Sequence, residues 1–268
     1  IGEIPQYFSK ERKLGFKRKK QSYMKTIVVK EGSRDIINEA FRVLRSNMDF
    51  MAGKDKGQNV FVLTSFNPGS GKSFLTMNIA MSFAIKKKKI LVIDGDLRHG
   101  SVSSYVDSPR IGLSDYLGNR VDNCNEIIVK DKKYDNLHIL PIGTVPPNPT
   151  ELLEDSKLAA LIETLRSEYD YIFIDCPPID IVADAQIIEK LADRTIFVVR
   201  SGLLDRSMLP ELENIYQEKR FKNLSMILNG TESAGGRYSY RYGYRYGYRY
   251  GYHNSYSSYY GSKGEMGG

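Results

Sequence analysis

Six short runs of apolar and β-branched residues recur along this chain, and they constrain its fold more than any other feature. They lie at 59–65, 89–96, 137–143, 171–177, 194–200 and 224–230. They show little of the polar alternation that a half-exposed strand needs, so each is predicted to be a strand covered on both faces. Strands of this kind belong to parallel sheets with helices on both sides.

Helical patterns fill the intervals between these strands, at 33–51, 71–87, 150–168, 183–192 and 206–220. Strand followed by helix, repeated, is typical of βαβ units. The 268 residues suffice for one large domain with appendages. We therefore predict an α/β fold with a mostly parallel sheet flanked by helices.

Charge divides the chain into three parts. Of its 39 Lys and Arg residues, nine lie in 1–30 and five in 231–268, whereas 31–230 carry 25 against 28 Asp and Glu. We predict a basic lead-in at 1–30, a folded domain at 31–230 and a disordered tail at 231–268. The basic cluster at 10–20 has two interpretations, a solvated linker or a segment lying against an anionic membrane surface.

The N-terminal residues and the two cysteines suggest the cellular setting. The first residue is Ile1, and neither a signal-peptide pattern nor an apolar run of membrane-spanning length occurs. We expect a piece of a longer protein whose preceding part holds a membrane anchor. Cys124 and Cys176 have neither CxxC spacing nor a His partner, which favours a reducing compartment over a disulfide framework or a zinc site.

The loop after the first predicted strand is rich in small residues and opens an amphipathic helix. Its backbone N–H groups and the helix dipole suit a phosphate, while a lysine reaches the terminal phosphates and a serine binds Mg²⁺. Phe66 stands where a P-loop has its first glycine. The predicted nucleotide-binding residues are Pro68, Gly69, Ser70, Gly71, Lys72 and Ser73.

Three aspartates end two of the predicted strands. Asp94 and Asp96 lie at the end of the run at 89–96, and Asp175 ends the apolar run that starts at 171. The carboxyl ends of parallel strands are where open α/β proteins bind ligands. The alternative is a helix-capping aspartate and surface aspartates, but three of them around one phosphate loop favour a shared site for ATP and Mg²⁺.

Several motifs together resemble the bacterial tyrosine kinases that accompany capsule and exopolysaccharide export, over roughly 31–230. They are EAFRVLR at 39–45, LVIDGDLR at 91–98, GLSDYL at 112–117, PIGTVPPNPTELL at 141–153 and IFIDCPP at 172–178. The resemblance implies a P-loop NTPase-like fold with a deviant Walker A loop, as in the septum-placement and partition ATPases. It also implies a protein-tyrosine kinase activity that uses ATP and Mg²⁺.

The resemblance assigns roles to the site residues. Lys72 holds the phosphates, Ser73, Asp96 and Asp175 surround Mg²⁺, and Asp94 orients and deprotonates the acceptor phenol. The catalytic set is thus Lys72, Asp94 and Asp96, although the division of labour between the two aspartates stays open. Arg98 either assists the phosphates or braces the loop. Asn229 lies where this fold class recognises adenine.

The helix predicted at 33–51 matches the ExxRxxR motif of the family with Glu39, Arg42 and Arg45. By spacing alone these residues form a polar band that favours intrahelical ion pairs. The resemblance instead implies that the band joins neighbouring subunits into a ring.

Two departures from related sequences are visible. The partition ATPases carry a second lysine where Asn67 stands, which argues against that class. Some of the kinases carry a regulatory tyrosine where Ser101 stands, so control by an internal phosphotyrosine is in doubt. Tyr105 lies nearby but is not assigned this role.

The tail holds eleven of the 19 tyrosines of the chain, with Gly, Ser and Arg around them. Alone, it indicates a disordered, self-associating segment. Beside a tyrosine kinase domain it becomes the substrate, phosphorylated in trans within a ring. The predicted acceptors are Tyr238, Tyr240, Tyr242, Tyr244, Tyr246, Tyr248, Tyr250, Tyr252, Tyr256, Tyr259 and Tyr260.

The resemblance also implies partners and a location. We expect self-association, an upstream transmembrane activator region of the same polypeptide, a protein-tyrosine phosphatase, and a place as the cytoplasmic domain of an inner-membrane protein. The main alternative is an ATPase switch without kinase activity. Nucleic-acid binding, suggested by the YRYG repeats, is not expected as the primary role because the folded part is slightly acidic.

Overall fold

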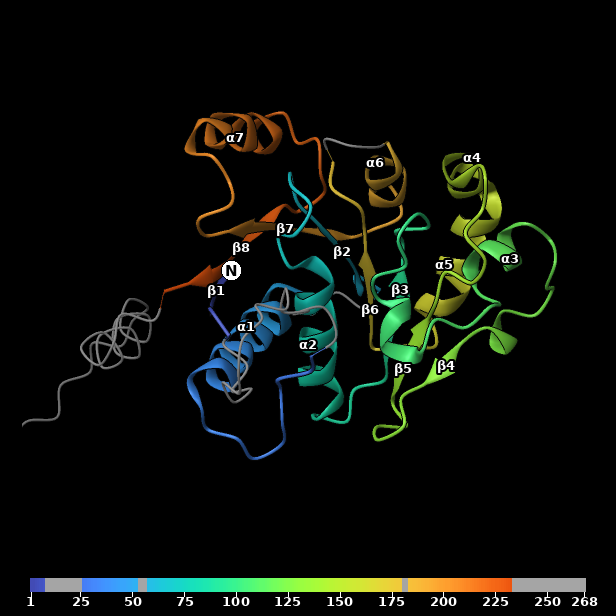
Figure 1. Cartoon of the computed structure of the whole chain (residues 1–268), viewed down its shortest axis with the longest axis horizontal. Coiled ribbons are helices and arrows are strands. Elements are labelled where there is room, and N and C mark those ends of the chain that lie inside the picture. Colours follow the sequence, from blue (N-terminus) through green and yellow to red (C-terminus); the bar gives the residue numbers. More distant parts are fainter. Residues whose placement is uncertain (8–25, 53–56, 180–182, 233–268) are drawn as a thin grey trace, which may run out of the picture. The chain divides into compact units, whose positions relative to one another are not determined.

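The computed structural model describes residues 1–7, 26–52, 57–179 and 183–232. Their centre is an eight-stranded sheet with the order β1-β8-β7-β2-β6-β3-β5-β4 (Figure 1). Neighbouring strands are parallel except β4 and β5, which are antiparallel. The strands are β1 Gly2–Pro5, β2 Val60–Thr64, β3 Ile90–Asp94, β4 Val129–Lys130, β5 Leu137–Leu140, β6 Tyr171–Asp175, β7 Arg194–Arg200 and β8 Ser225–Thr231.

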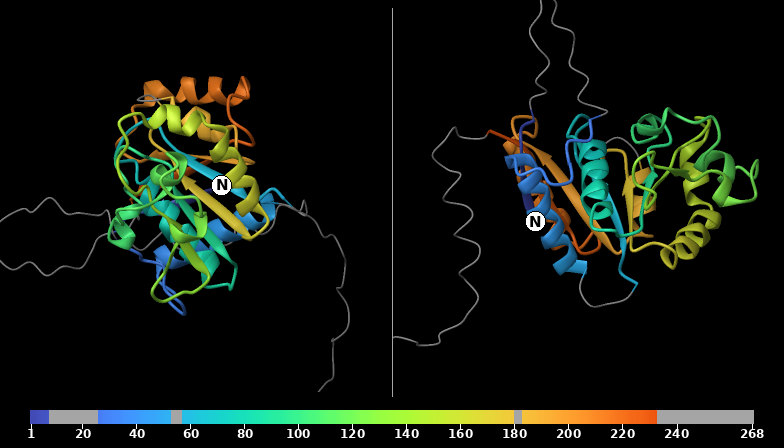
Figure 2. Two further views of the ribbon diagram at one scale, coloured as in Figure 1. Left: turned by 90° about the vertical axis from the view of Figure 1, so that its right-hand side faces the viewer. Right: turned by 90° about the horizontal axis from the view of Figure 1, so that it is seen from below.

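Helices cover both faces of the sheet (Figures 1 and 2). α1 and α2 pack on one face, and the apolar residues of α3, α5, α6 and α7 pack on the other. The α-helices are α1 Ile36–Ala52, α2 Lys72–Ala84, α3 Leu113–Leu117, α4 Pro149–Glu154, α5 Ser156–Arg166, α6 Asp184–Glu189 and α7 Leu209–Gln217. In the described ranges, short 3₁₀ helices also occur between the α-helices: η2 Ser103–Val106, η3 Cys124–Glu126 and η4 Arg206–Met208.

The central strands show why the predicted runs lack polar alternation. Along β2, Val60 and Val62 join the core under α5 and α6, while Phe61 and Leu63 join the core under α1 and α2. Because side chains alternate between faces and both faces are buried, every position must be apolar. The predicted parallel sheet and all six strands are confirmed.

Two strands were not predicted. β1 pairs in parallel with β8, so residues 2–5 belong to the sheet although they fall in the predicted lead-in. β4 is a two-residue edge strand beside β5. Both are too short to give a periodic signal, and their partners decide that they are strands. The basic cluster at 10–20 lies outside the described residues.

The helix predicted at 150–168 is two helices. Asp155 is extended, with φ −63° and ψ 137°, and its carboxylate accepts a hydrogen bond from Lys157 N at 2.7 Å. Asp155 therefore ends α4 and caps α5, because an aspartate side chain satisfies an N–H group that the first helical turn leaves unpaired.

α2 is buried on all sides, whereas the sequence predicted an amphipathic helix. Its outer face is covered by α1 and by the segment that precedes α1. Asn78 ties this segment down, since its Oδ1 accepts from Val28 N at 2.7 Å and from Val29 N at 3.1 Å. The phosphate loop therefore leads into a helix that is held from all directions.

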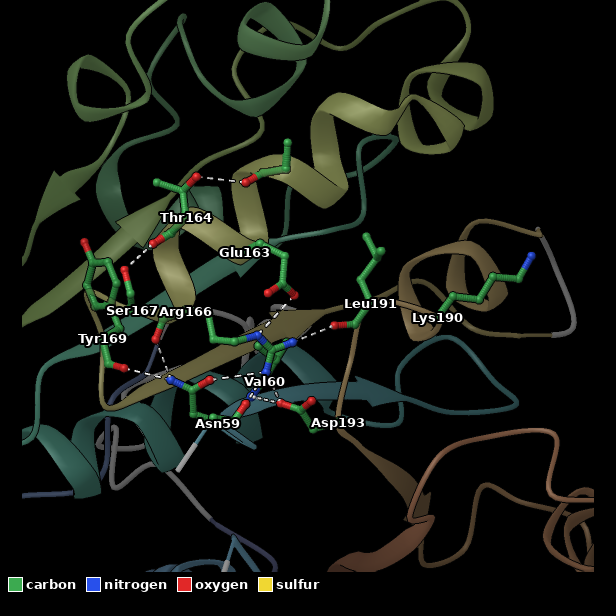
Figure 3. A network of polar contacts seen from close by, with 12 residues as sticks. Asn59, Val60, Glu163, Thr164, Arg166, Ser167, Tyr169, Lys190, Leu191 and Asp193 are labelled. Carbon is green, nitrogen blue, oxygen red and sulfur yellow. Dashed lines mark hydrogen bonds and ion pairs between the residues drawn. The ribbon is translucent and has the colours of Figure 1, made fainter. Parts of the chain in front are cut away.

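The amino edge of the sheet is fastened by Arg166 at the end of α5 (Figure 3). Its Nη1 lies 2.5 Å from Asp193 Oδ2, and the same oxygen accepts from Val60 N at 2.9 Å. Asn59 Nδ2 donates to Tyr169 O at 2.8 Å. These contacts join the starts of β2 and β7 to α5. Within the described segments, no helix has the length and apolar character needed to cross a bilayer.

Candidate active site

The loop between β2 and α2 turns sharply at two glycines. Gly69 has φ 76° and Gly71 has φ 92°, a left-handed conformation that favours glycine. A Cβ at Gly71 would lie 2.3 Å from Asn229 Nδ2. The turn and the close approach explain why small residues are needed here, and they place the N-terminus of α2 at the carboxyl edge of the sheet.

Two side chains from the ends of other strands hold this loop. Asn229 Nδ2 donates to Ser70 O at 2.8 Å, and Arg200 Nη1 donates to Gly69 O at 2.7 Å. Asn229 was predicted to recognise adenine; here its amide contacts the loop backbone. Arg200 was not predicted, although its place as the last residue of a buried strand could have singled it out.

Lys72 is the first residue of α2, and its side chain is buried. Its Nζ donates to Ser65 Oγ at 3.2 Å. Burial lowers the pKa of Lys72, while the charges of Asp175 and Asp96 act in the opposite direction. The lysine therefore lies between the loop and the carboxylates.

Asp175 ends β6 beneath α2. Its Oδ2 accepts from Ser73 Oγ at 2.5 Å, and its Oδ1 accepts from Thr76 Oγ1 at 3.4 Å. Burial raises the pKa of Asp175 to about 6, although the Ser73 bond and the Lys72 charge lower it. Ser73 and Asp175, both predicted around Mg²⁺, are thus in contact. Thr76 was not predicted, although it follows Ser73 by three positions on α2.

Asp94 stands beside Asp175 because β3 and β6 are parallel and these residues are in register. Its side chain is completely buried, and Oδ2 accepts from Ser103 N at 2.6 Å and Ser103 Oγ at 2.7 Å. Within the described part of the chain, Oδ1 has no hydrogen-bond partner. Burial and the charge of Asp175 raise the pKa of Asp94 to about 7. The sequence did not single out Ser103.

Asp96 lies just beyond the end of β3 and is nearly buried. Its Oδ1 accepts from Arg98 N at 3.2 Å, and its Oδ2 lies 3.1 Å from His99 Nδ1. The Arg98 side chain turns to Asp184 instead, with Nε 3.0 Å from Asp184 Oδ2. Of the two roles considered for Arg98, the geometry favours bracing: the residue joins the loop after β3 to α6.

The three carboxylates and Lys72 create an excess of negative charge in a largely buried site. This fits a divalent cation, since Mg²⁺ takes oxygen ligands and keeps waters and substrate phosphates in its shell. Among the described residues, no group of three or more His, Cys, Asp or Glu side chains converges as a protein-only metal cage. The donor set therefore suits magnesium brought in with a nucleotide.

Glu39, Arg42 and Arg45 lie on α1. Arg42 pairs with Glu39 within the helix and also donates to Ser33 O. Arg45 Nη1 donates to Ser82 O of α2 at 2.9 Å. Arg42 and Arg45 line a cavity of about 190 Å³ beside the segment at 29–32. An intrahelical ion pair is thus present, and the two arginines also border a hollow.

The predicted acceptors in the tail, from Tyr238 to Tyr260, lie outside the described residues. The site as described is therefore the phosphate loop with Lys72 and Ser73, the carboxylates of Asp94, Asp96 and Asp175, and the loop contacts of Arg200 and Asn229. It contains what phosphoryl transfer needs from a protein: phosphate-binding groups, oxygen ligands and a carboxylate oxygen without a partner.

Comparison with known proteins agrees with this geometry. Residues 58–217 match the AAA domain family. The putative tyrosine-protein kinase CapB of Staphylococcus aureus is 33% identical over 212 residues, covering 79% of this chain and 92% of CapB. The kinase domain of Escherichia coli tyrosine kinase ETK superposes with a TM-score of 0.72 at 27% identity, covering 94% of each chain.

The septum site-determining protein MinD of Pyrococcus horikoshii, solved with Mg-ADP, superposes with a TM-score of 0.54 at 26% identity, covering 64% of this chain and 70% of MinD. The predicted P-loop fold of the septum-placement ATPase type is therefore confirmed. The similarity to the kinases extends further along the chain and is greater in both sequence and structure. The chain belongs to the AAA domain family and, within it, to the bacterial tyrosine kinases.

Proposed function

We propose that this chain is an ATP-dependent protein-tyrosine autokinase that phosphorylates its own tyrosine-rich tail in trans within a ring and so regulates capsule or exopolysaccharide polymerisation and export. One observation supports it above the others. A phosphate loop with its lysine and three carboxylates meet at one end of the sheet, and one buried oxygen of Asp94 has no hydrogen-bond partner among the described residues. The kinase relatives support tyrosine as the acceptor.

The roles of the residues follow from their positions. The loop N–H groups and Lys72 bind the β- and γ-phosphates of ATP, and Asn229 is proposed at the adenine. Ser73, Asp96 and Asp175 hold Mg²⁺, which neutralises phosphate charge when bound. The bond from Pγ to the bridging oxygen breaks while the tyrosine Oη bonds to Pγ.

Asp94 Oδ1 takes the phenol proton in this scheme. A general base works best when its pKa lies near the operating pH, and in the metal-free chain burial beside Asp175 raises the pKa of Asp94 to about 7. This is still below the ordinary phenol pKa of about 10, so proton transfer accompanies formation of the new bond.

The tail suits the role of substrate in reach and charge. A flexible chain of about 30 residues has a root-mean-square reach of roughly 30 Å, enough to enter a neighbouring site in an oligomer. Residues 231–268 carry five Lys and Arg against two Asp and Glu. Each phosphotyrosine adds about −1.5 to −2 charges, so two or three modifications make the tail acidic. The acidic tail is then repelled by the carboxylates of the site and dissociates from it, and the ring loosens.

Self-association is supported by the exposed face of α1. Ile36, Val43 and Phe50 are spaced seven residues apart, and 62%, 57% and 87% of their surfaces are exposed. An apolar stripe of this spacing runs along one side of a helix and is costly to leave in water. Glu39 lies on the same exposed side, and Arg42 and Arg45 lie beside it.

The remaining proposals concern the setting. We place the chain on the cytoplasmic side of the inner membrane, beside a transmembrane activator region of the same polypeptide. The basic cluster at 10–20 suits the anionic inner leaflet. A phosphatase is required because the cycle needs a dephosphorylated tail to begin again.

Mass spectrometry of the purified chain before and after incubation with ATP and Mg²⁺ tests the function. The expected result is several phosphates on the tail tyrosines. The main rival, an ATPase switch, would release inorganic phosphate and leave the chain unmodified. That outcome would overturn the proposal.

Light scattering tests the oligomer. Phe50→Glu places a charge on the apolar stripe and is expected to reduce the mass of the unphosphorylated chain in solution to that of the monomer. Tyr216→Glu is a matched control, since Tyr216 is 56% exposed on α7. If Phe50→Glu and Tyr216→Glu both keep the wild-type mass, α1 is not the interface.

A further inference from the structure

Among the described residues, Ser103 is the only one that hydrogen bonds to the side chain of Asp94. Its N–H and its hydroxyl both reach the same oxygen, Oδ2, at 2.6 and 2.7 Å. The other oxygen, Oδ1, is buried and has no partner among the residues that the structure describes. The carboxylate is therefore held on one side only.

The Ser103 hydroxyl group also accepts a hydrogen bond, which limits where its own proton can point. Ile142 N donates to Ser103 Oγ at 2.8 Å. Because an N–H group occupies a lone pair of the hydroxyl oxygen, the single hydroxyl proton is free to point at Asp94. The bond from Ser103 to Asp94 Oδ2 is thus an oriented one, and it connects the end of β3 to the residues after β5.

The backbone that precedes Ser103 is itself anchored. Val102 is completely buried in the core under α1 and α2. Gly100 has φ 59°, and a Cβ there would lie 2.8 Å from Ile142 Cδ1, so the turn packs tightly against Ile142. Because its neighbours are packed tightly, Ser103 is held in place and would not move together with the Asp94 carboxylate if that group rotated.

We propose that Ser103 is a positioning residue for phosphoryl transfer: it fixes the Asp94 carboxylate through Oδ2 and leaves Oδ1 as the only oxygen free to meet the acceptor phenol. This inference rests on the proposed function, in which Asp94 takes the phenol proton. Rotation of the Asp94 carboxylate would exchange its two oxygens or move Oδ1 away from the acceptor phenol. Misplacement of a reacting group by about 1 Å can cost about a hundredfold in rate.

The test compares Ser103→Ala, Ser103→Thr and Ser104→Ala in the full chain. Ser104 is a matched control, because it neighbours Ser103 but its hydroxyl donates to Ser101 O at 2.7 Å. We measure kcat and KM for ATP in phosphotyrosine formation, and the affinity for a fluorescent ATP analogue. Ser103→Ala keeps the N–H bond to Oδ2, so we expect kcat to fall about tenfold, with ATP affinity within about twofold of wild type. Ser103→Thr should recover most of kcat, and Ser104→Ala should resemble wild type.

A double-mutant cycle with Asp94→Asn separates positioning from a general structural role. If Ser103 acts through Asp94, adding Ser103→Ala to Asp94→Asn lowers the residual rate no further. A second tenfold loss in the double variant would overturn the inference, as would a Ser103→Ala variant with wild-type kcat. So would a parallel loss of ATP affinity, which would place the effect at the nucleotide.

The two proposals fail in different ways. If the wild-type chain forms no phosphotyrosine but hydrolyses ATP, the kinase proposal is wrong. The same variants are then compared by their hydrolysis rates. A Ser103→Ala effect that vanishes in the Asp94→Asn background supports positioning of Asp94 in that reaction too, and equal hydrolysis rates for Ser103→Ala and wild type exclude it.

Discussion

The carboxylates at the two edges of the central sheet have opposite surroundings. At the amino edge, Asp193 has a partner for its charge, since Arg166 lies 2.5 Å away and Val60 N donates to the same oxygen. At the carboxyl edge, Asp94 and Asp175 lie side by side in register, and one lysine is close by. The carboxylate at the amino edge is therefore paired with a cation of its own, whereas the two carboxylates at the carboxyl edge have one lysine between them.

The difference appears in the pKa values. Burial lowers the pKa of Arg166, but the bond and charge of Asp193 outweigh it, so the pKa lies above its ordinary value. At the other edge, burial raises the pKa of Asp175 to about 6 and that of Asp94 to about 7. Groups that a fold leaves unsatisfied in this way are candidates for binding and chemistry. The fold is therefore stabilised at one edge and kept reactive at the other.

The largest effect is expected from a substitution at the carboxyl edge. Lys72→Met removes the cation that binds the phosphates and should reduce phosphotyrosine formation about a thousandfold, the scale seen when one preorganised charge-stabilising group is lost. Radiolabelled ATP measures it, and circular dichroism checks the fold. Lys190→Met is the control, since Lys190 is exposed at the end of α6. Undiminished labelling in Lys72→Met would mean that the active site lies elsewhere.

A smaller effect, on stability alone, is expected at the amino edge. Arg166→Met leaves Asp193 without its cation in a site where both side chains are 18% exposed. We expect a loss of about 3 kcal/mol and a fall in melting temperature of roughly 6 °C or more, with kcat unchanged at 20 °C.

Arg220→Met provides the comparison for Arg166→Met. Its pair with Glu211 is 39% and 44% exposed, and such a surface pair contributes about 1 kcal/mol or less. Equal melting temperatures for the two variants would show that the amino edge is not specially stabilised.

The smallest effect has the opposite sign. Asp94 has an ordinary pKa of 3.8 but a pKa of about 7 in the folded protein. The folded state therefore binds this proton more tightly than the unfolded state, and the carboxylate destabilises the fold increasingly as pH rises from about 4 to about 7. Asp94→Asn carries no charge, so without Mg²⁺ it should melt about 4 °C above wild type at pH 8.

This gain should shrink as pH falls toward 4, where wild-type Asp94 is itself protonated in the fold. Melting curves from pH 4 to pH 8 measure it, and Asp193→Asn should show a loss at pH 8 because Arg166 loses its less exposed partner and keeps only Glu163, which is 68% exposed. A gain in Asp94→Asn that does not depend on pH would contradict the raised pKa. Nucleotide binding should survive in Asp94→Asn while the rate of phosphotyrosine formation falls about a hundredfold or more.

Much of the fold and part of the site could be predicted because their signals are local. A strand buried on both faces must be apolar at every position, so six strands and their mostly parallel arrangement could be predicted from the sequence. The phosphate loop needs small residues within a few positions, and its glycines do adopt left-handed conformations. Parallel strands bring their carboxyl ends to one edge, so the meeting of Asp94 and Asp175 could also be expected.

The rest depends on contacts between residues far apart in the chain. Arg200 holds the phosphate loop across 131 positions, and Arg98 meets Asp184 across 86. β1 is a strand only because β8 lies beside it. Pairing of this kind leaves no periodic trace in a short segment, so β1 could not be predicted, and the contact of Arg200 with Gly69 O could not be predicted either.

Residue spacing is enough to predict the sheet, the phosphate loop and the strand ends at which the acids lie. The protonation of those acids depends on how the chain folds around them. Asp94, Asp175 and Asp193 are the same residue type, but the first two are buried beside each other and the third faces Arg166. Burial and neighbouring charge set a pKa, and both are properties of the folded chain.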